Sequence, residues 1–166
     1  MRGYPQAGYL RLISLIGWEK RPIVPLALLP QYLFHDVVTV APQQTVTWVV
    51  KVLAQNRIGA VPVINKEGQL IGIISERDII RGMSEHTDAV LTLAVDQLMT
   101  RDVKTCSFED QLVDIMEVMT LQRIRHLPVI QNGALHGIVS IGDVVKQRLE
   151  EVQSEAEELQ RYIRSP

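Results

Sequence analysis

Two stretches of the sequence combine a hydroxyl group with a carboxylate at the same spacing. Ser75 is followed by Asp78 and Ser140 by Asp143, and each pair comes directly after an apolar run. This order predicts a buried strand that leads into a helix, whose first turn leaves unpaired backbone N–H groups and a partial positive charge. Such a helix end favours anions. The hydroxyl, and a carboxylate that can only accept hydrogen bonds, suit a phosphate together with a sugar diol.

The same pattern also has a purely structural interpretation. Ser-x-x-Asp before an apolar run is a capping-box pattern, which stabilises a helix by about 1 kcal/mol without any ligand. The two roles are compatible, because a cap fixes the helix end that a phosphate would then meet. The sequence around the motifs is therefore needed to decide between them.

Cationic residues lie near both motifs but differ between them. Arg77 lies inside the first motif, and the equivalent residue of the second is Gly142. Arg125 and His126 precede the apolar run of the second copy. The equivalent residues of the first copy are Gly59 and Ala60. These cations could pair with phosphates. Alternatively, Arg77 is exposed or bonded to a neighbouring carboxylate. His126 either forms part of a cleft wall or is a polar group packed at a strand edge.

Both motifs belong to an internal duplication. An offset of 66 residues aligns 36–39 with 102–105 and 57–64 with 123–130. One residue is then lost in a turn, and an offset of 65 aligns the glycines and the Ser-x-x-Asp residues. Agreement in order, spacing and residue type indicates a tandem repeat.

Each repeat predicts the same order of elements. A short strand (37–40 or 103–106) precedes a helix whose apolar residues recur at helical spacing, and two strands joined by a tight glycine turn form an antiparallel hairpin. The helix after the Ser-x-x-Asp motif completes a βαββα unit, so we expect an α+β fold. Pro62 and Pro128 cannot donate to a ladder, which favours a strand start or an edge and leaves nearby backbone groups free to face a cleft.

The segments outside the repeats are read more simply. Residues 82–95 are expected to connect the repeats, with a short helix starting at about 95–99. After Val145 an apolar stripe at helical spacing predicts a C-terminal helix over 149–163 with glutamates on its opposite side.

Composition limits the classes of function. A net charge of −2 argues against nucleic acid as a partner, because phosphate neutralisation needs a basic face. No run of about 18 apolar residues is present, so we expect no membrane partner and a cytoplasmic location. Residues 1–18 carry two arginines and no acid, a weak likeness to a targeting segment; a loosely packed extension is the alternative that we favour.

The remaining motifs do not indicate catalysis or metal binding. The single cysteine, Cys106, lies in an apolar strand and is expected to be a small buried hydrophobe rather than a reactive thiol. The histidines have no metal-ligand spacing, and no nucleophile elbow or phosphate-binding loop occurs. We therefore expect no enzyme activity, no metal and no required cofactor.

Taken together, these features resemble a tandem pair of CBS domains, also called a Bateman module, of the kind found in small stand-alone bacterial proteins. The resemblance covers about residues 36–148 and is specific because the motifs are duplicated. It implies two βαββα repeats packed about a pseudo-twofold axis. We divide the chain into an extension (1–35), repeat 1 (36–84), a connection (85–101), repeat 2 (102–148) and a C-terminal helix (149–166).

The resemblance also implies ligands and ligand contacts. CBS pairs bind adenosine-bearing molecules such as AMP, ADP, ATP, NAD(H) or S-adenosylmethionine in two clefts between the repeats, and the sequence does not choose among these. Carried over by motif, the hydroxyls face phosphate and the aspartates face ribose. The candidate ligand-binding residues are Ser75, Asp78, Ser140, Asp143, Arg77, Thr39, Thr105, Ala60, Val61, Pro62, Arg125, His126, Leu127 and Pro128.

Three functions are compatible with this resemblance. The first is a regulatory module that senses energy or redox state through an adenosine-containing ligand and is read by a partner protein. The second is a structural or interaction protein with empty clefts. The third is an accessory regulator of a separate enzyme. We also expect a homodimer, because apolar residues on the motif helices and on the C-terminal helix would otherwise be bare.

Overall fold

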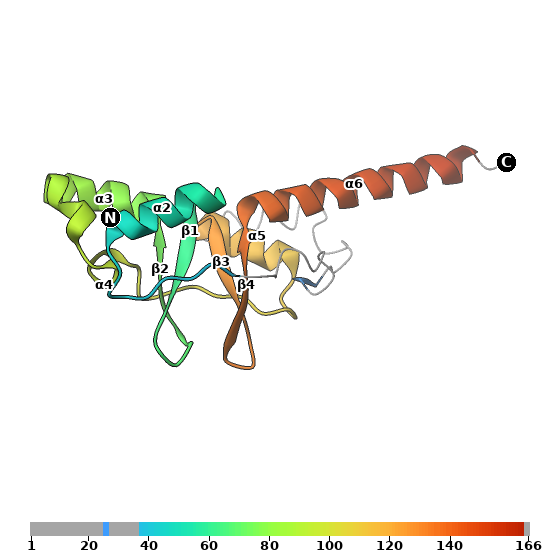
Figure 1. Cartoon of the computed structure of the whole chain (residues 1–166). Helices are drawn as coiled ribbons and strands as arrows, with labels where there is room; N and C mark the ends of the chain where they lie inside the picture. The colour runs from blue at the N-terminus through green and yellow to red at the C-terminus, as the bar shows by residue number, and fades with distance from the viewer. Residues whose placement is uncertain (1–24, 27–36, 165–166) are drawn as a thin grey trace.

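The structure is a computed structural model that describes residues 25–26 and 37–164 (Figure 1). The possible targeting segment and most of the predicted extension lie outside the described residues. The described residues begin with Pro25 and Leu26, and Pro25 forms an isolated antiparallel bridge with Gln111 of repeat 2. The two repeats then follow in chain order.

The two repeats contain the same elements in the same order. Repeat 1 consists of α2 (Val46–Asn56), β1 (Ala60–Ile64), β2 (Leu70–Ser75) and α3 (Glu76–His86), and repeat 2 of α5 (Leu112–Leu121), β3 (His126–Gln131), β4 (Ala134–Ser140) and α6 (Ile141–Arg164). Each strand pair is an antiparallel hairpin. The two hairpins lie side by side with their turns pointing the same way (Figure 1). The predicted α+β fold is confirmed.

The two hairpins pair their strands in the same register. Val63 pairs with Gly72 in repeat 1 and Val129 pairs with Gly137 in repeat 2, and an irregularity follows directly after this pair in both. The second turn is shorter, with positive φ at Asn132 (51°) and Gly133 (78°). Asn-Gly with positive φ at both positions is the preferred two-residue hairpin turn.

The opening strand of each repeat is shorter than predicted. It forms a single parallel bridge, Val40 with Val63 in repeat 1 and Cys106 with Val129 in repeat 2. Pairing stops there because the chain turns at once, with backbone bonds from Gln44 to Ala41 and from Asp110 to Ser107. Cys106 is buried, as predicted, and its pKa is raised to about 12 because burial and nearby Asp110 disfavour the thiolate.

The two strand prolines confirm one part of the prediction and correct another. Pro62 and Pro128 lie inside β1 and β3, on the outer edge of each two-stranded hairpin, so the predicted edge position holds. Their carbonyl oxygens accept hydrogen bonds of 3.0 Å from the N–H groups of Val40 and Cys106, so they are not free to face a cleft. Proline is tolerated here because its missing N–H lies on the outer side of the hairpin, where the partner makes only one bridge.

The connection between the repeats is more ordered than expected. Helix α3 continues to His86, and a 3-10 helix, η4 (Thr87–Thr92), and α4 (Val95–Leu98) follow. Gly82 does not end the helix. An ideal Cβ at this position would lie 2.9 Å from side-chain atoms of Val90 and Leu98, so glycine allows η4 and α4 to pack directly on α3.

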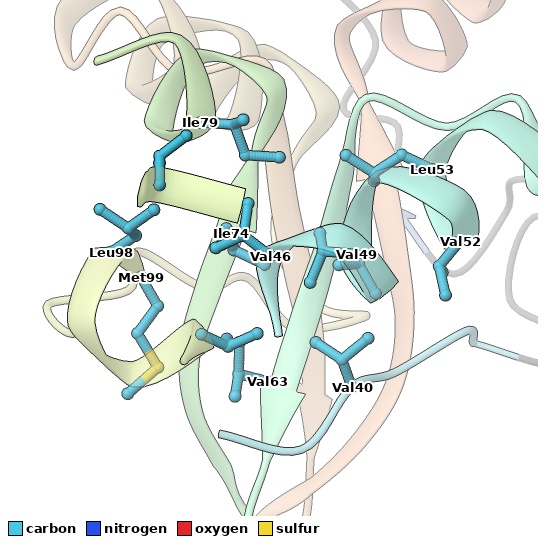
Figure 2. Close-up of a cluster of buried hydrophobic side chains, with 13 residues drawn as sticks. Val40, Val46, Val49, Val52, Leu53, Val63, Ile74, Ile79, Leu98 and Met99 are labelled. Carbon is cyan, nitrogen blue, oxygen red and sulfur yellow. The ribbon is translucent and has the colours of Figure 1, made fainter. Parts of the chain in front are cut away.

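Each repeat has its own apolar core. In repeat 1 it gathers side chains from α2, the hairpin, α3 and α4 (Figure 2). Val95 belongs to this core, and its N–H donates to Gln44. In the second core the same place is taken by Leu26, whose N–H donates to Asp110. The core of repeat 1 is therefore closed by the connection that follows it in the chain, and the core of repeat 2 by Leu26, which lies before repeat 1.

The predicted C-terminal helix is confirmed as part of one longer helix. Helix α6 starts at Ile141, directly after the second motif, and its far half extends away from the hairpins (Figure 1). Of the apolar residues on the motif helices, which we expected to be bare in a monomer, Ile79 and Val144 are instead buried in the two cores. The exposed apolar side chains are those on the opposite sides of the helices: Ile80 and Met83 on α3, and Val145, Leu149 and Val152 on α6.

Candidate functional site

Both Ser-x-x-Asp motifs form complete capping boxes. In repeat 1 the N–H and hydroxyl of Ser75 donate to Asp78 Oδ2 at 2.9 and 2.5 Å, and the Asp78 N–H returns a bond to Ser75 Oγ at 3.4 Å. Ser140 and Asp143 repeat this arrangement at 2.9, 2.6 and 3.4 Å. The structural interpretation of the motif therefore holds in both copies, and any ligand contact comes in addition to it.

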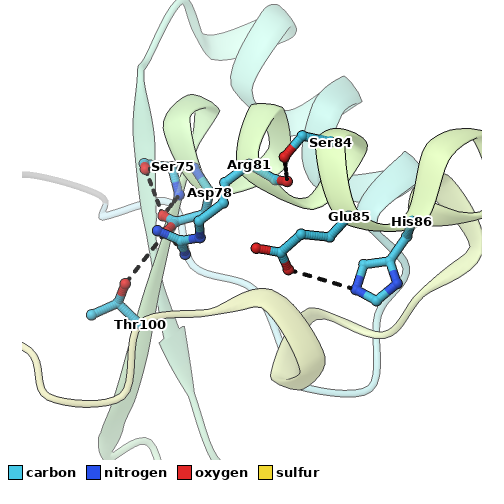
Figure 3. Close-up of polar contacts among 7 residues, drawn as sticks. All are labelled: Ser75, Asp78, Arg81, Ser84, Glu85, His86 and Thr100. Atoms are coloured by element: carbon cyan, nitrogen blue, oxygen red, sulfur yellow. Dashed lines mark hydrogen bonds and ion pairs between the residues drawn. The ribbon is translucent and has the colours of Figure 1, made fainter.

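The two aspartates differ in their burial and in their further hydrogen bonds. Asp78 is 6% exposed, and its Oδ1 accepts a bond of 2.7 Å from Arg81 and one of 3.4 Å from Thr100 (Figure 3). Thr100 belongs to the connection that leads to repeat 2, and its backbone pairs with Ile73 of β2. Asp143 is only partly buried. Asp78 is thus the more strongly structural of the pair.

A cavity of about 420 Å³ lies between the repeats, with walls from both. It brings together seven of the predicted site residues: Ala60, Ser75, Arg77, Asp78, Arg125, His126 and Ser140.

Seven other predicted residues do not line this cavity: Asp143, Thr39, Thr105, Val61, Pro62, Leu127 and Pro128. Val61 and Leu127 are buried among core side chains, and Thr105 is exposed. Their part in binding stays a prediction.

Several cavity residues were missed by the sequence analysis. They are mostly polar or charged and come from three places: the first turns of α3, the start of repeat 2 and the end of α5. They include Glu76, Arg81, Thr100, Asp102, Lys104, Gln122 and Arg123. The helical spacing of Arg81 from Asp78 was a usable signal. Thr100, Asp102 and Lys104 were not detectable, because only the tertiary fold brings the start of repeat 2 against α3.

Two contacts join the repeats at the cavity wall. Arg77 Nη1 donates a bond of 2.7 Å to the backbone carbonyl of Arg123, so the arginine meets a neutral acceptor and not the neighbouring carboxylate considered above. His126 lies against Gly59, where an ideal Cβ would be 3.2 Å from His126 Cε1. A side chain at position 59 would therefore press on the imidazole, which would have to shift by a few tenths of an ångström.

The burial of His126 favours its neutral form. Burial and the positive charge of Arg125 lower the pKa of His126, while Glu76 and Asp143 oppose this shift more weakly. The ring therefore offers one donor and one acceptor nitrogen to the cavity at neutral pH. This agrees with the alternative that places His126 in a cleft wall.

Within the part of the chain that the structure describes, no group of histidine, cysteine and carboxylate side chains is arranged to hold a metal ion. Among those same residues, no helix combines the length and the apolar character that crossing a membrane requires.

Known proteins share both the sequence motifs and this architecture. The family model for the CBS domain matches residues 31–85 and again 95–150. The chain belongs to the CBS domain family. The two matches coincide with the two structural repeats, so the molecule is a CBS pair.

Individual relatives agree with this assignment. The mitochondrial CBS domain-containing protein CBSX3 of Arabidopsis thaliana is 37% identical over 123 residues, which are 72% of this chain and 60% of that protein. This CBS pair thus spans less than two thirds of that relative's length.

Solved structures show the same fold. A CBS-domain-containing protein from Agrobacterium tumefaciens is 42% identical with a TM-score of 0.67, covering 68% of this chain and 84% of its own. The CBS domain pair of protein MJ0100, solved with 5-methylthioadenosine and S-adenosyl-L-methionine, has a TM-score of 0.67 at 20% identity, covering 78% of this chain and 99% of that one.

Proposed function

We propose that this CBS pair is a non-catalytic regulatory module that binds an adenosine-containing ligand in the cavity between its repeats. The observation that carries the proposal is the cavity itself, whose walls combine the first Ser-x-x-Asp motif with residues 122–126 and Ser140 of repeat 2. CBS pairs are regulatory modules, and the MJ0100 pair holds two adenosine derivatives. A ligand here would contact both repeats at once.

Regulation would follow from this shared wall. A ligand that bonds both repeats stabilises one placement of the repeats relative to the other, since it can shift a conformational equilibrium by its difference in affinity for the two states. A partner protein, or a separate enzyme that the module controls, would read this change. The polar lining provides the donors and acceptors, and Ile73, Val103 and Ile124 provide an apolar surface for a flat ring.

The first test is equilibrium dialysis of the purified protein against AMP, ADP, ATP, NADH, S-adenosylmethionine and 5-methylthioadenosine. We expect at least one to bind, and a variant Ala60→Trp to bind it at least tenfold more weakly, because the indole ring would occupy cavity space that the ligand needs. A circular dichroism melt of the variant provides the folding control. If none of the six compounds binds, the structural alternative with empty clefts replaces the proposal.

We also propose that the module is a homodimer. The exposed side chain of Ile80 on α3 borders an open groove of about 680 Å³ between α2 and α3, which Val50 and Leu53 also line. Met83, three residues further along α3, is exposed as well. Apolar surface of this kind usually marks a contact. A closed twofold would bury the face on both copies at once.

Sedimentation equilibrium tests the dimer. We expect the full chain to be dimeric at micromolar concentration and Ile80→Glu to be monomeric, because a dimer would bury the new charge on both copies. A chain that ends before Glu150 decides whether Val152 and the rest of the α6 stripe contribute. Glu85→Lys, a charge change elsewhere on α3, is the control. A monomeric full chain rules the dimer out.

A further inference from the structure

Arg77 links the motif helix of repeat 1 to the backbone of repeat 2. It is the second residue of α3, it lines the cavity, and its guanidinium bonds the Arg123 carbonyl at 2.7 Å. Arg123 follows α5 with a φ of 54°, a left-handed conformation that turns the chain from the helix toward β3. The bond therefore holds the guanidinium at the junction of the two repeats.

The equivalent junction on the other side has the same backbone but lacks this side chain. Arg57 follows α2 with a φ of 55°, just as Arg123 follows α5. The N–H of the next residue closes an equivalent bond in each repeat, from Ile58 to Leu53 and from Ile124 to Met119. The residue equivalent to Arg77, however, is Gly142. The duplicated backbone is thus symmetric, and at this helix position only repeat 1 has a cation.

The partners of the nearby cations sharpen this asymmetry. Arg81 and Lys104 are paired with Asp78 and Asp102. The partner of Arg77 is a neutral carbonyl, so its positive charge is not cancelled and it keeps further N–H donors in a planar fork. Carboxylate and phosphate oxygens are the acceptors that such a fork fits best.

We propose that Arg77 is a specificity-determining residue that gives the cavity a one-sided preference for phosphorylated ligands. The Arg123 carbonyl positions the guanidinium, and its remaining N–H groups bind phosphate oxygens on the Ser75 side. The Ser140 side has Gly142 at the equivalent position and lacks this carbonyl-anchored guanidinium, although Arg125 lies beside it in the cavity wall. The proposal rests on the proposed function in that the phosphate belongs to an adenosine-bearing ligand. It narrows that ligand to a nucleotide rather than S-adenosylmethionine, which has a sulfonium cation in place of a phosphate.

Three variants test this proposal by isothermal titration calorimetry with ATP, adenosine and inorganic triphosphate. We expect Arg77→Ala to weaken ATP and triphosphate by about tenfold, and adenosine by less than about twofold, because the lost bond is charge-assisted and phosphate-specific. Arg77→Lys keeps the charge but cannot hold a carbonyl and a phosphate with one planar fork, so it should recover only part of the affinity.

Gly142→Arg is the matched control on the opposite side. An ideal Cβ at this position meets Ser140 Oγ at 3.5 Å and nothing nearer, so an arginine can be accommodated. Added to Arg77→Ala, it should restore triphosphate binding by several-fold if a cation at either junction serves the same purpose. Melting temperatures without ligand confirm that all variants are folded.

The arms separate the two proposals. A protein that binds neither adenosine nor any of the six dialysis compounds overturns the proposed function, while triphosphate binding that Arg77→Ala weakens still supports the anion role of Arg77. Triphosphate that does not bind, or that binds the wild type and Arg77→Ala equally, overturns the inference about Arg77. An equal loss for ATP and adenosine overturns it as well, because Arg77 would then support the whole cavity rather than the phosphate.

Discussion

Leu26→Ala is expected to lower the free energy of unfolding by about 3 kcal/mol, as other deletions of a fully buried leucine do. Leu26 lies outside both repeats in the sequence, yet it is 0% exposed and belongs to the core of repeat 2. Truncating it removes buried apolar surface and leaves a cavity that the strands and α5 cannot close. Urea unfolding followed by circular dichroism measures the loss.

Two variants serve as controls for Leu26. Val95→Ala removes the equivalent side chain from repeat 1, which is also 0% exposed, and should cost a comparable amount. Leu121→Ala removes a leucine that is 59% exposed and should cost well under about 1 kcal/mol. If Leu26→Ala behaves like Leu121→Ala, the segment before repeat 1 does not close the second core.

Asp78→Ala is expected to cost about 3 kcal/mol of stability, whereas Asp143→Ala should cost about 1 kcal/mol. Both substitutions remove a helix cap. Asp78 is also buried and accepts bonds from Arg81 and Thr100, so its loss leaves the Thr100 hydroxyl and the Ser75 N–H without their carboxylate. The same urea titration compares the two variants directly.

This difference decides how the motif should be tested for ligand binding. If Asp78→Ala loses ligand binding, the loss could come from local unfolding of α3 or from a missing ligand contact. Asp78→Asn separates the two, because an amide oxygen can still accept from Ser75 while the ion pair with Arg81 is lost. Equal stabilities of Asp78→Ala and Asp143→Ala would show that the contacts with Arg81 and Thr100 contribute little.

The sequence alone determined the repeated unit and most of its elements. The hairpins follow from alternating apolar residues and the glycine turns, and both capping boxes follow from the spacing of Ser75 from Asp78 and of Ser140 from Asp143. These features depend on neighbours a few residues apart in the chain, so a linear pattern records them. The duplication then doubled every signal and made the CBS family recognisable.

The tertiary structure decided everything that joins the repeats. The contacts of Leu26 with the second core, of Thr100 with Asp78 and of Arg77 with the Arg123 carbonyl each connect residues far apart in sequence, and no periodicity encodes them. The same holds for Pro62, whose carbonyl was free in the linear pattern but is taken by Val40 once the opening segment folds back. Backbone and side-chain groups find such partners only after the chain has packed, because burial requires each polar group to be bonded by whatever segment lies beside it.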